Sequence, residues 1–240
     1  AVATALLALT GESPPSNYVI PAVPPARFEP GGEFGRLLKK FRCLSCHVIH
    51  GAGYNLSTVD LTAEGSRARK DWIRQYLLIP YSLRPVLEER MPVFRMTAVE
   101  AEVLSDYISK VFVDDAIPDS LEPEPSAAEA QAGRKLFDER GCIACHILGK
   151  SGGYVGPSLN GAGLRLKAGF IYRWVLSPKS LKPGTRDPDQ KFSEEEARTL
   201  TAFLLQQKAG EWLKGPAAPA NPSGEQGSVK STAPAGGSTR

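Results

Sequence analysis

Two copies of the pattern Cys-x-x-Cys-His, at residues 43–47 and 142–146, constrain this 240-residue chain more than any other feature. Two thiols one helical turn apart can add to the two vinyl groups on one edge of a porphyrin, and the histidine that follows can bind the iron. The sequence therefore predicts two covalently bound c-type haems. The attachment residues are Cys43, Cys46, Cys142 and Cys145, and the proximal iron ligands are His47 and His146.

Three other roles for cysteine pairs compete with this interpretation. The four cysteines could form disulfides, hold a zinc ion, or act as two redox dithiols. None of these roles explains why a histidine follows each pair in a chain with only three histidines. Zinc ribbons of this type also separate their pairs by about 15 to 20 residues, far less than the spacing here. The haem interpretation is therefore preferred.

An internal repeat divides the chain into two similar halves. Adding 98 to the residue number superposes Leu61 on Leu159 and Arg67 on Arg165, and nearer the C-terminal end of each copy the offset becomes 96. An acidic, Pro-rich stretch between the copies is typical of a link. The predicted organisation is a Pro-rich arm (1–30), a first domain (31–113), a link (114–125), a second domain (126–214) and a flexible low-complexity tail (215–240).

Both halves are expected to be all-α, because no alternating strand pattern occurs in them. Three capping boxes announce helix starts, and two further helices are expected at 71–79 and 169–177, each ended by a proline. After the first box, apolar side chains at helical spacing predict a buried face on one helix. The boxes are Thr97 with Glu100, Ser126 with Glu129, and Ser193 with Glu196; the apolar face is Val103, Leu104, Tyr107, Ile108 and Val111.

Residues 31–113 and 126–212 resemble the class I cytochrome c family, and the whole chain resembles dihaem proteins with two such domains in tandem. The resemblance implies helices wrapped around one covalent haem in each domain. It implies that Met91, in Arg-Met-Pro before the last helix, is the distal iron ligand of the first haem, with Met96 a wall residue. It also implies that the Pro157 carbonyl, in Gly-Pro-Ser-Leu, accepts a hydrogen bond from His146, with Val59 at the equivalent place for His47.

The second domain departs from the family pattern at its distal side. Asp187 stands where the first domain has Met91, and no methionine follows Met96. A carboxylate is a poor ligand for a low-spin electron-transfer haem. The second iron is therefore expected to be five-coordinate, bound to water, or held by a lysine such as Lys179 or Lys182. A surface or hydrogen-bonding role is expected for the third histidine, His50.

Composition limits the remaining classes of function. The net charge is only +3 and the basic residues are dispersed, so a nucleic-acid partner is not expected. The apolar stub at residues 1–9 is shorter than the ~20 residues of a membrane span. We expect it to be a processed remnant, an arbitrary end of the sequence, or the end of a longer membrane helix. Covalent haem attachment implies maturation outside the cytoplasm.

The resemblance implies an electron-transfer protein, not itself an enzyme. It would pass single electrons between a donor and an acceptor protein on the extracytoplasmic (periplasmic) side. We expect either the membrane-associated head or subunit of a respiratory or photosynthetic complex, such as a quinol-oxidising bc-type complex, or a periplasmic carrier. A haem enzyme of peroxidase type or a gas sensor, using an open sixth position on the second haem, is the alternative.

Overall fold

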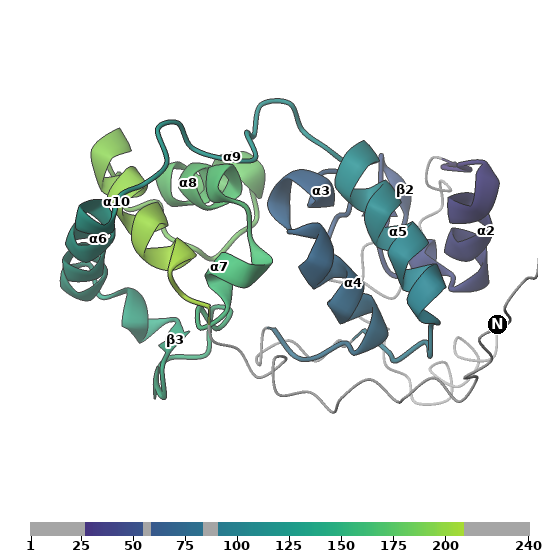
Figure 1. Ribbon diagram of the computed structural model, residues 1–240, viewed down its shortest axis with the longest axis horizontal. Helices are drawn as coiled ribbons and strands as arrows, with labels where there is room; N and C mark the ends of the chain where they lie inside the picture. The colour runs from purple at the N-terminus through teal and green to yellow at the C-terminus, as the bar shows by residue number, and fades with distance from the viewer. Residues whose placement is uncertain (1–26, 55–58, 84–90, 209–240) are drawn as a thin grey trace, which may run out of the picture.

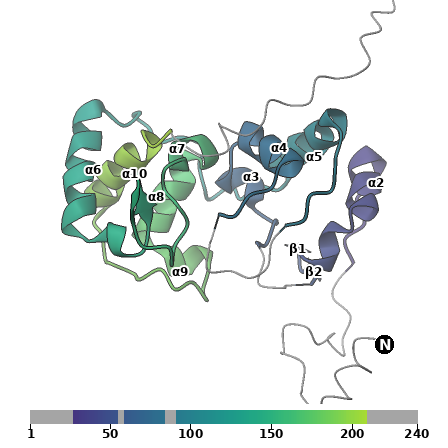
Figure 2. The same ribbon diagram turned by 90° about the horizontal axis from the view of Figure 1, so that it is seen from below.

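The computed structural model describes residues 27–54, 59–83 and 91–208. Within them the chain forms two groups of helices that lie side by side along the longest axis of the molecule (Figures 1 and 2). Most of the predicted arm, residues 1–26, and the predicted tail lie outside the described residues.

The helices divide between the groups in chain order. The first lobe holds α2 (Gly32–Lys40), α3 (Glu64–Arg67), α4 (Lys70–Leu78) and α5 (Ala98–Val111). The second lobe holds α6 (Ala127–Glu139), α7 (Ala162–Arg165), α8 (Ala168–Leu176), α9 (Pro178–Leu181) and α10 (Glu194–Leu205). A 3-10 turn opens each cysteine motif: η2 (Cys43–Ser45) and η3 (Cys142–Ala144). The described chain is predominantly helical, as the sequence predicted.

A small antiparallel hairpin follows each motif, which the sequence did not predict. Strand β1 (Val48–Ile49) pairs with β2 (Ala52–Gly53), and β3 (Ile147–Leu148) pairs with β4 (Ser151–Gly152). Each strand has only two residues, too few to show an alternating pattern. Glycines with positive φ, Gly51 and Gly149, supply the left-handed backbone that tight hairpin turns favour.

The three predicted capping boxes are confirmed. In each, the hydroxyl at the N-cap accepts a hydrogen bond from the backbone three residues on, and the glutamate there accepts one from the N-cap backbone. Two free amides are satisfied at each helix start, and removing an N-cap hydroxyl typically costs about 1 kcal/mol. The boxes start α5, α6 and α10.

Helix α5 supplies the centre of the first lobe's core. Leu104 and Ile108 are buried as predicted, and the Tyr107 ring stacks on Phe34 of α2 at 3.8 Å between centroids. The prediction for Val111 was wrong, because its side chain is 47% exposed. The helix ends there, and the next residue, Phe112, is fully buried in its place.

Helices α6 and α10 form the centre of the second lobe and cross at close range. A Cβ on Gly133 would lie 1.9 Å from the Thr199 carbonyl oxygen, so only glycine allows this approach. The rings of Phe137 and Phe203 pack beside the crossing, 5.3 Å apart.

The segment predicted as a link runs from α5 to α6 (Figure 1) and packs on the second lobe. Ile117 and Leu121 are buried. A Cβ on Gly169 of α8 would lie 1.8 Å from the Pro118 carbonyl oxygen, and Lys167 forms an ion pair with Asp119. The link therefore holds its place by packing.

The two lobes also touch directly, through an isolated antiparallel bridge between Ala68 and Leu166. The Arg69 amide donates to the Arg165 carbonyl at 2.9 Å, and the Lys167 amide donates to the Arg67 carbonyl at 3.0 Å. Ala68 and Leu166 are separated by the 98-residue offset of the repeat, so the bridge joins equivalent positions. The lobes meet in a locally two-fold arrangement.

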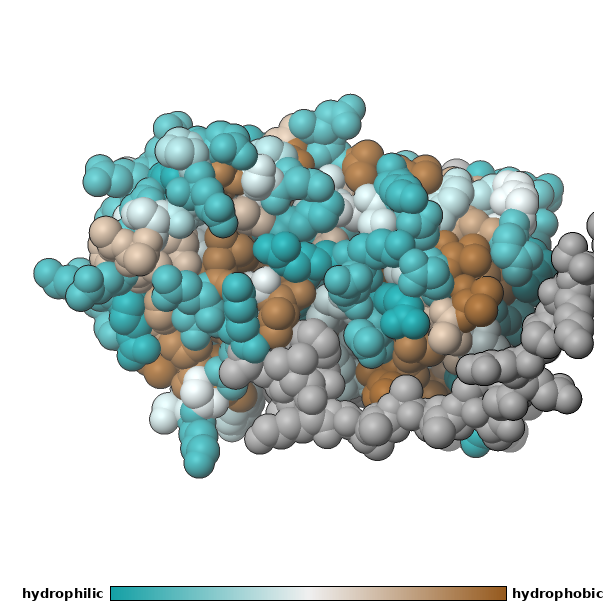
Figure 3. All heavy atoms as spheres, viewed as in Figure 1, coloured by the Kyte–Doolittle hydropathy of each residue, from teal (hydrophilic) through white to brown (hydrophobic). Residues whose placement is uncertain are grey.

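The surface shows apolar side chains in separate patches between polar ones, over both lobes, on the face seen in Figure 3. Among the residues that the structure describes, no helix combines the length and the apolar character needed to cross a membrane.

Candidate haem site

The backbone gives both cysteine motifs the same shape. A residue in the left-handed region precedes each 3-10 turn, Arg42 with φ of 51° and Gly141 with φ of 66°. The amide of the motif histidine then bonds the carbonyl of the first cysteine, at 2.9 Å for His47 and 3.1 Å for His146. One compact turn therefore carries both thiols and the imidazole.

Each motif histidine has one ring nitrogen held by the backbone. The Nδ1 of His47 lies 2.8 Å from the Val59 carbonyl oxygen, and the Nδ1 of His146 lies 2.8 Å from that of Pro157. A carbonyl only accepts, so Nδ1 carries the proton and donates. This tautomer gives Nε2 the lone pair that an iron needs, and the bond fixes the ring orientation. The two acceptors are the carbonyls named from the sequence.

Glycines shape the cradle around these histidines. A Cβ on Gly156 would lie 2.4 Å from Cε1 and 2.6 Å from Nδ1 of the His146 ring. On the hairpins, Gly53 and Gly152 have positive φ, and a Cβ there would lie 2.2 Å and 2.1 Å from the carbonyl oxygens of His47 and His146. The His146 imidazole thus packs directly against the backbone of Gly156.

The first thiol of each motif is partly buried. All four cysteines are free, and within the described ranges no group of three or more His, Cys, Asp or Glu side chains could hold a metal ion. Burial raises the pKa of Cys43 to about 11 and raises that of Cys142. Thiol exchange needs the thiolate, so the raised pKa argues against a reactive dithiol. The geometry fits thioether attachment, with a histidine ligand presented alongside.

The two methionines of the first lobe occupy different environments. Met91 is half-buried and packs against the buried cluster of that lobe, to which Cys43 also packs. Met96 is a member of the buried cluster and is only 7% exposed. A partly accessible thioether on the cluster that Cys43 also contacts suits a distal ligand, and a fully packed one suits a wall.

In the second lobe, Asp187 stands at the position equivalent to Met91, and its carboxylate accepts a hydrogen bond. The indole Nε1 of Trp174, on α8, donates to the Asp187 carboxylate, and the Asp187 amide donates to the Thr185 hydroxyl at 3.2 Å. Asp187 is half-buried and, after burial itself, contributes to raising the pKa of Cys142. Lys179 and Lys182 are exposed.

The third histidine belongs to the first lobe. The ring of His50 lies 5.4 Å from that of Phe28 and 5.8 Å from that of Phe112. Its amide donates to the Thr62 hydroxyl at 2.8 Å. The side chain of His50 is exposed, in agreement with the surface role expected from the sequence, whereas its hydrogen bond comes from the backbone amide.

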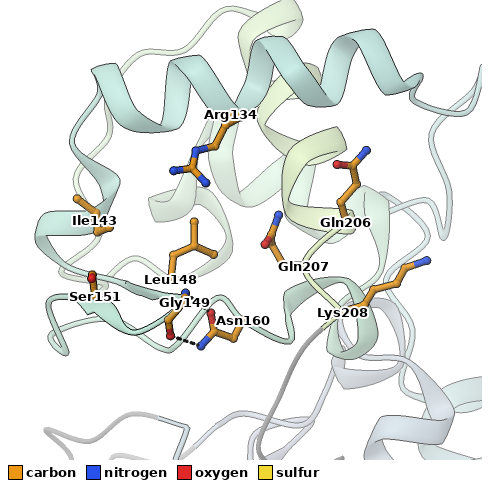
Figure 4. A pocket seen from close by; sticks show the side chains of 9 residues that line it. All are labelled: Arg134, Ile143, Leu148, Gly149, Ser151, Asn160, Gln206, Gln207 and Lys208. Carbon is orange, nitrogen blue, oxygen red and sulfur yellow. Dashed lines mark hydrogen bonds between the residues drawn. The ribbon is translucent and has the colours of Figure 1, made fainter.

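A depression of about 630 Å³ lies beside the second motif, between α6, the hairpin and the end of α10 (Figure 4). Its walls include Arg134, Asn160 and Gln207, and the Asn160 side chain bonds the Gly149 backbone across its floor. Neither cysteine nor His146 lines it. It is a surface hollow of mixed polar and apolar lining that borders the second motif through Ile143.

Sequence reasoning missed two side chains beside these centres. The repeat places Trp174 on Tyr76, which gives no sign of the bond from Trp174 to Asp187. Tyr81 stands in a stretch without a motif, yet it accepts a hydrogen bond from Trp72 at 3.0 Å. No signal in a single sequence could have found either contact.

Comparison with known proteins supports the assignment for one lobe. The pattern of the family described as Cytochrome c matches residues 130–208. Over 97 residues the chain is 35% identical to a protein named cytochrome c oxidase subunit 2 from Alkalihalophilus pseudofirmus, an alignment covering 37% of this chain and 28% of that protein. The chain therefore spans well under a third of that relative's length. No solved structure matches.

The matched residues contain the second Cys-x-x-Cys-His turn, which includes His146, and the Pro157 carbonyl that orients the His146 ring. Residues 130–208 therefore resemble a cytochrome c domain, the kind of domain that carries iron in a covalently attached c-type haem.

Proposed function

We propose that the chain is a dihaem cytochrome c of two tandem domains that transfers single electrons between a donor and an acceptor protein. The carrying observation is that the first lobe repeats the geometry of the matched domain: the same turn, and the same 2.8 Å contact from histidine Nδ1 to a backbone carbonyl. Haem supplies one reversible electron per iron when it is bound.

The protein's own residues attach and orient each group. The cysteine pairs fix one porphyrin edge to each lobe, and the Val59 and Pro157 carbonyls hold the histidine rings in the orientation that presents Nε2. In the first lobe Met91 supplies the distal ligand, and a thioether favours ferrous iron and raises the potential. We assign no general acid or base to either haem site, and we propose that the chain acts as an electron carrier.

The haem count tests this proposal. The protein would be made in a host that matures c-type cytochromes, and haem per chain measured by the pyridine haemochrome assay. We expect two in the unmodified chain. Replacing either Cys43 and Cys46, or Cys142 and Cys145, with serine should leave one. A count of one in the unmodified protein would reject the tandem assignment and leave the second lobe alone as a cytochrome.

For its place in the cell, we propose the extracytoplasmic side, as a subunit or head of a membrane respiratory complex. The similarity to a protein named cytochrome c oxidase subunit 2 supports membership of such a complex. A quinol-oxidising bc-type complex and a free periplasmic carrier are the other settings. Separating membrane and periplasmic fractions of the native host, and staining for haem at the mass of this chain, distinguishes a complex from a carrier.

One observation favours a second function at the second haem. Asp187, at the position of the distal methionine, is engaged by Trp174 and offers no soft ligand. A sixth position left to water would admit CO, NO or peroxide. Carbon monoxide added to the reduced protein should then change its spectrum, and Asp187→Met should abolish the change. A wholly low-spin ferric protein that ignores CO would remove this function.

A further inference from the structure

The contact between the lobes is symmetric in its backbone and asymmetric in its side chains. Arg67 and Arg165 are equivalent in the repeat and flank the bridge. Arg67 pairs with Glu64 of its own lobe at 2.8 Å and lies 5.8 Å from the Phe170 ring of the other lobe. In the second lobe the position equivalent to Glu64 is Ala162. The two arginines therefore have different surroundings.

Arg165 is buried, with 5% of its surface exposed, and its contacts reach in two directions. Towards the first lobe, its guanidinium is close enough to the Tyr81 hydroxyl to lower the pKa of that phenol electrostatically. Burial raises the pKa of Tyr81, against the lowering effects of the Trp72 and Arg165 contacts. Trp72, itself 4% exposed, donates to the same hydroxyl at 3.0 Å. A buried tryptophan of the first lobe thus fixes the half-buried tyrosine that faces an arginine of the second.

Towards its own lobe, Arg165 faces the segment that orients the proximal histidine. Its two terminal nitrogens lie 3.4 and 3.5 Å from the Ser158 carbonyl oxygen. Ser158 directly follows Pro157, whose carbonyl oxygen accepts a hydrogen bond from His146 Nδ1 at 2.8 Å. Groups beyond the ligand tune a bound metal through such hydrogen bonds. The Arg165 guanidinium lies beside the carbonyl that follows Pro157 in the chain. It is therefore in a position to tune a bound iron through the hydrogen bond between Pro157 and His146.

We propose that Tyr81 of the first lobe positions the Arg165 guanidinium beside the peptide that holds His146, so that the first lobe sets the reduction potential of the second haem. The coupling runs one way, because the repeat places Lys179, an exposed residue, at the position equivalent to Tyr81. A nearby cation disfavours the additional positive charge of ferric iron. Loosening Arg165 should therefore lower the second potential. The inference rests on the proposed presence of two haems.

The test is a spectroelectrochemical titration of the full chain, after its haem count has been measured. Tyr81→Phe removes only the hydroxyl. Tyr107→Phe is the matched control, since that ring stacks on Phe34 at the end of the first lobe away from the second (Figures 1 and 2). Asp187→Asn, a change within the second lobe, identifies which redox component belongs to the second haem.

We expect Tyr81→Phe to shift the second midpoint potential downwards, and Tyr107→Phe to leave it unchanged. Arg165→Gln should shift the same component further, and adding Tyr81→Phe to Arg165→Gln should produce no additional shift. Additive shifts, or an unshifted second component in Tyr81→Phe, would overturn the inference while two haems are counted. A count below two would instead reject the proposed function. If Arg165→Gln does not fold, the comparison between the two tyrosine variants decides alone.

Discussion

Replacing Gly156 with alanine should disrupt the support of His146. The new methyl group would lie 2.4 Å from the ring Cε1 and 2.6 Å from Nδ1, whereas carbon atoms in contact sit ~3.5–4.0 Å apart. The ring, or the backbone beneath it, must therefore move by about 1 Å. A movement of the ring away from Gly156 strains the 2.8 Å bond to the Pro157 carbonyl, since such bonds fail beyond ~3.5 Å.

The expected loss of stability has two parts. Overpacking a well-packed site costs about 1–3 kcal/mol, and losing the histidine hydrogen bond costs about 1 kcal/mol more. We therefore expect the second lobe to be destabilised by about 2–4 kcal/mol. The iron–histidine bond should weaken as well, because the ring loses the contact that orients it.

Guanidinium denaturation of the haem-loaded protein, followed by circular dichroism and by the haem spectrum, measures both effects. Gly184→Ala in the same lobe is the matched control, since a Cβ there meets no atom within 4 Å. Both variants restrict the unfolded chain equally, so the difference between them reports the native contact. Equal stability and equal spectra for the two variants would refute the steric argument.

Three further predictions concern other parts of the molecule. Met91→Ala should lower one midpoint potential and abolish the far-red sulfur-to-iron band, and an unchanged band would contradict the ligand assignment. The pKa of Glu129 is lowered from 4.5 to about 2, first by hydrogen bonds from Ser126 and then by one from Arg198. The contribution of the Glu129 carboxylate to the free energy of unfolding is therefore complete above pH 4.5 and is lost as the pH falls towards 2. Acid titration of unfolding should therefore be shallower in Glu129→Gln, and identical acid profiles would argue against the bond. Gly133→Ala places a Cβ 1.9 Å from the Thr199 carbonyl oxygen and should cost about 3 kcal/mol by forcing α6 and α10 apart, a loss that denaturant unfolding would show or disprove.

The helices could be predicted from the sequence because their signals are local. A capping box involves residues three apart, so Ser193 with Glu196 is recognisable without knowledge of the fold. The attachment turn is local in the same way, since its chemistry is contained in five consecutive residues. The prediction for Val111 failed because burial at a helix end depends on where the chain turns, and there Phe112 takes the core position.

The contacts that cross the molecule could not be predicted. The bond from Trp174 to Asp187 joins residues 13 apart through a loop whose path is set by packing. The contact of Arg165 with Tyr81 depends on how two lobes meet, which no periodicity encodes. The repeat showed that Arg67 and Arg165 are equivalent, yet it did not indicate that their neighbouring backbones pair with each other.

The bridge between Ala68 and Leu166 has the geometry of an isologous homodimer, in which one surface patch binds its own copy. Two separate copies would form this contact only at sufficient protein concentration. A covalent tether converts such an encounter into an intramolecular one, with an effective concentration in the millimolar range for short linkers. Joining the copies in one chain therefore makes their pairing insensitive to dilution, which a pair of free subunits that meet through the same contact would not be.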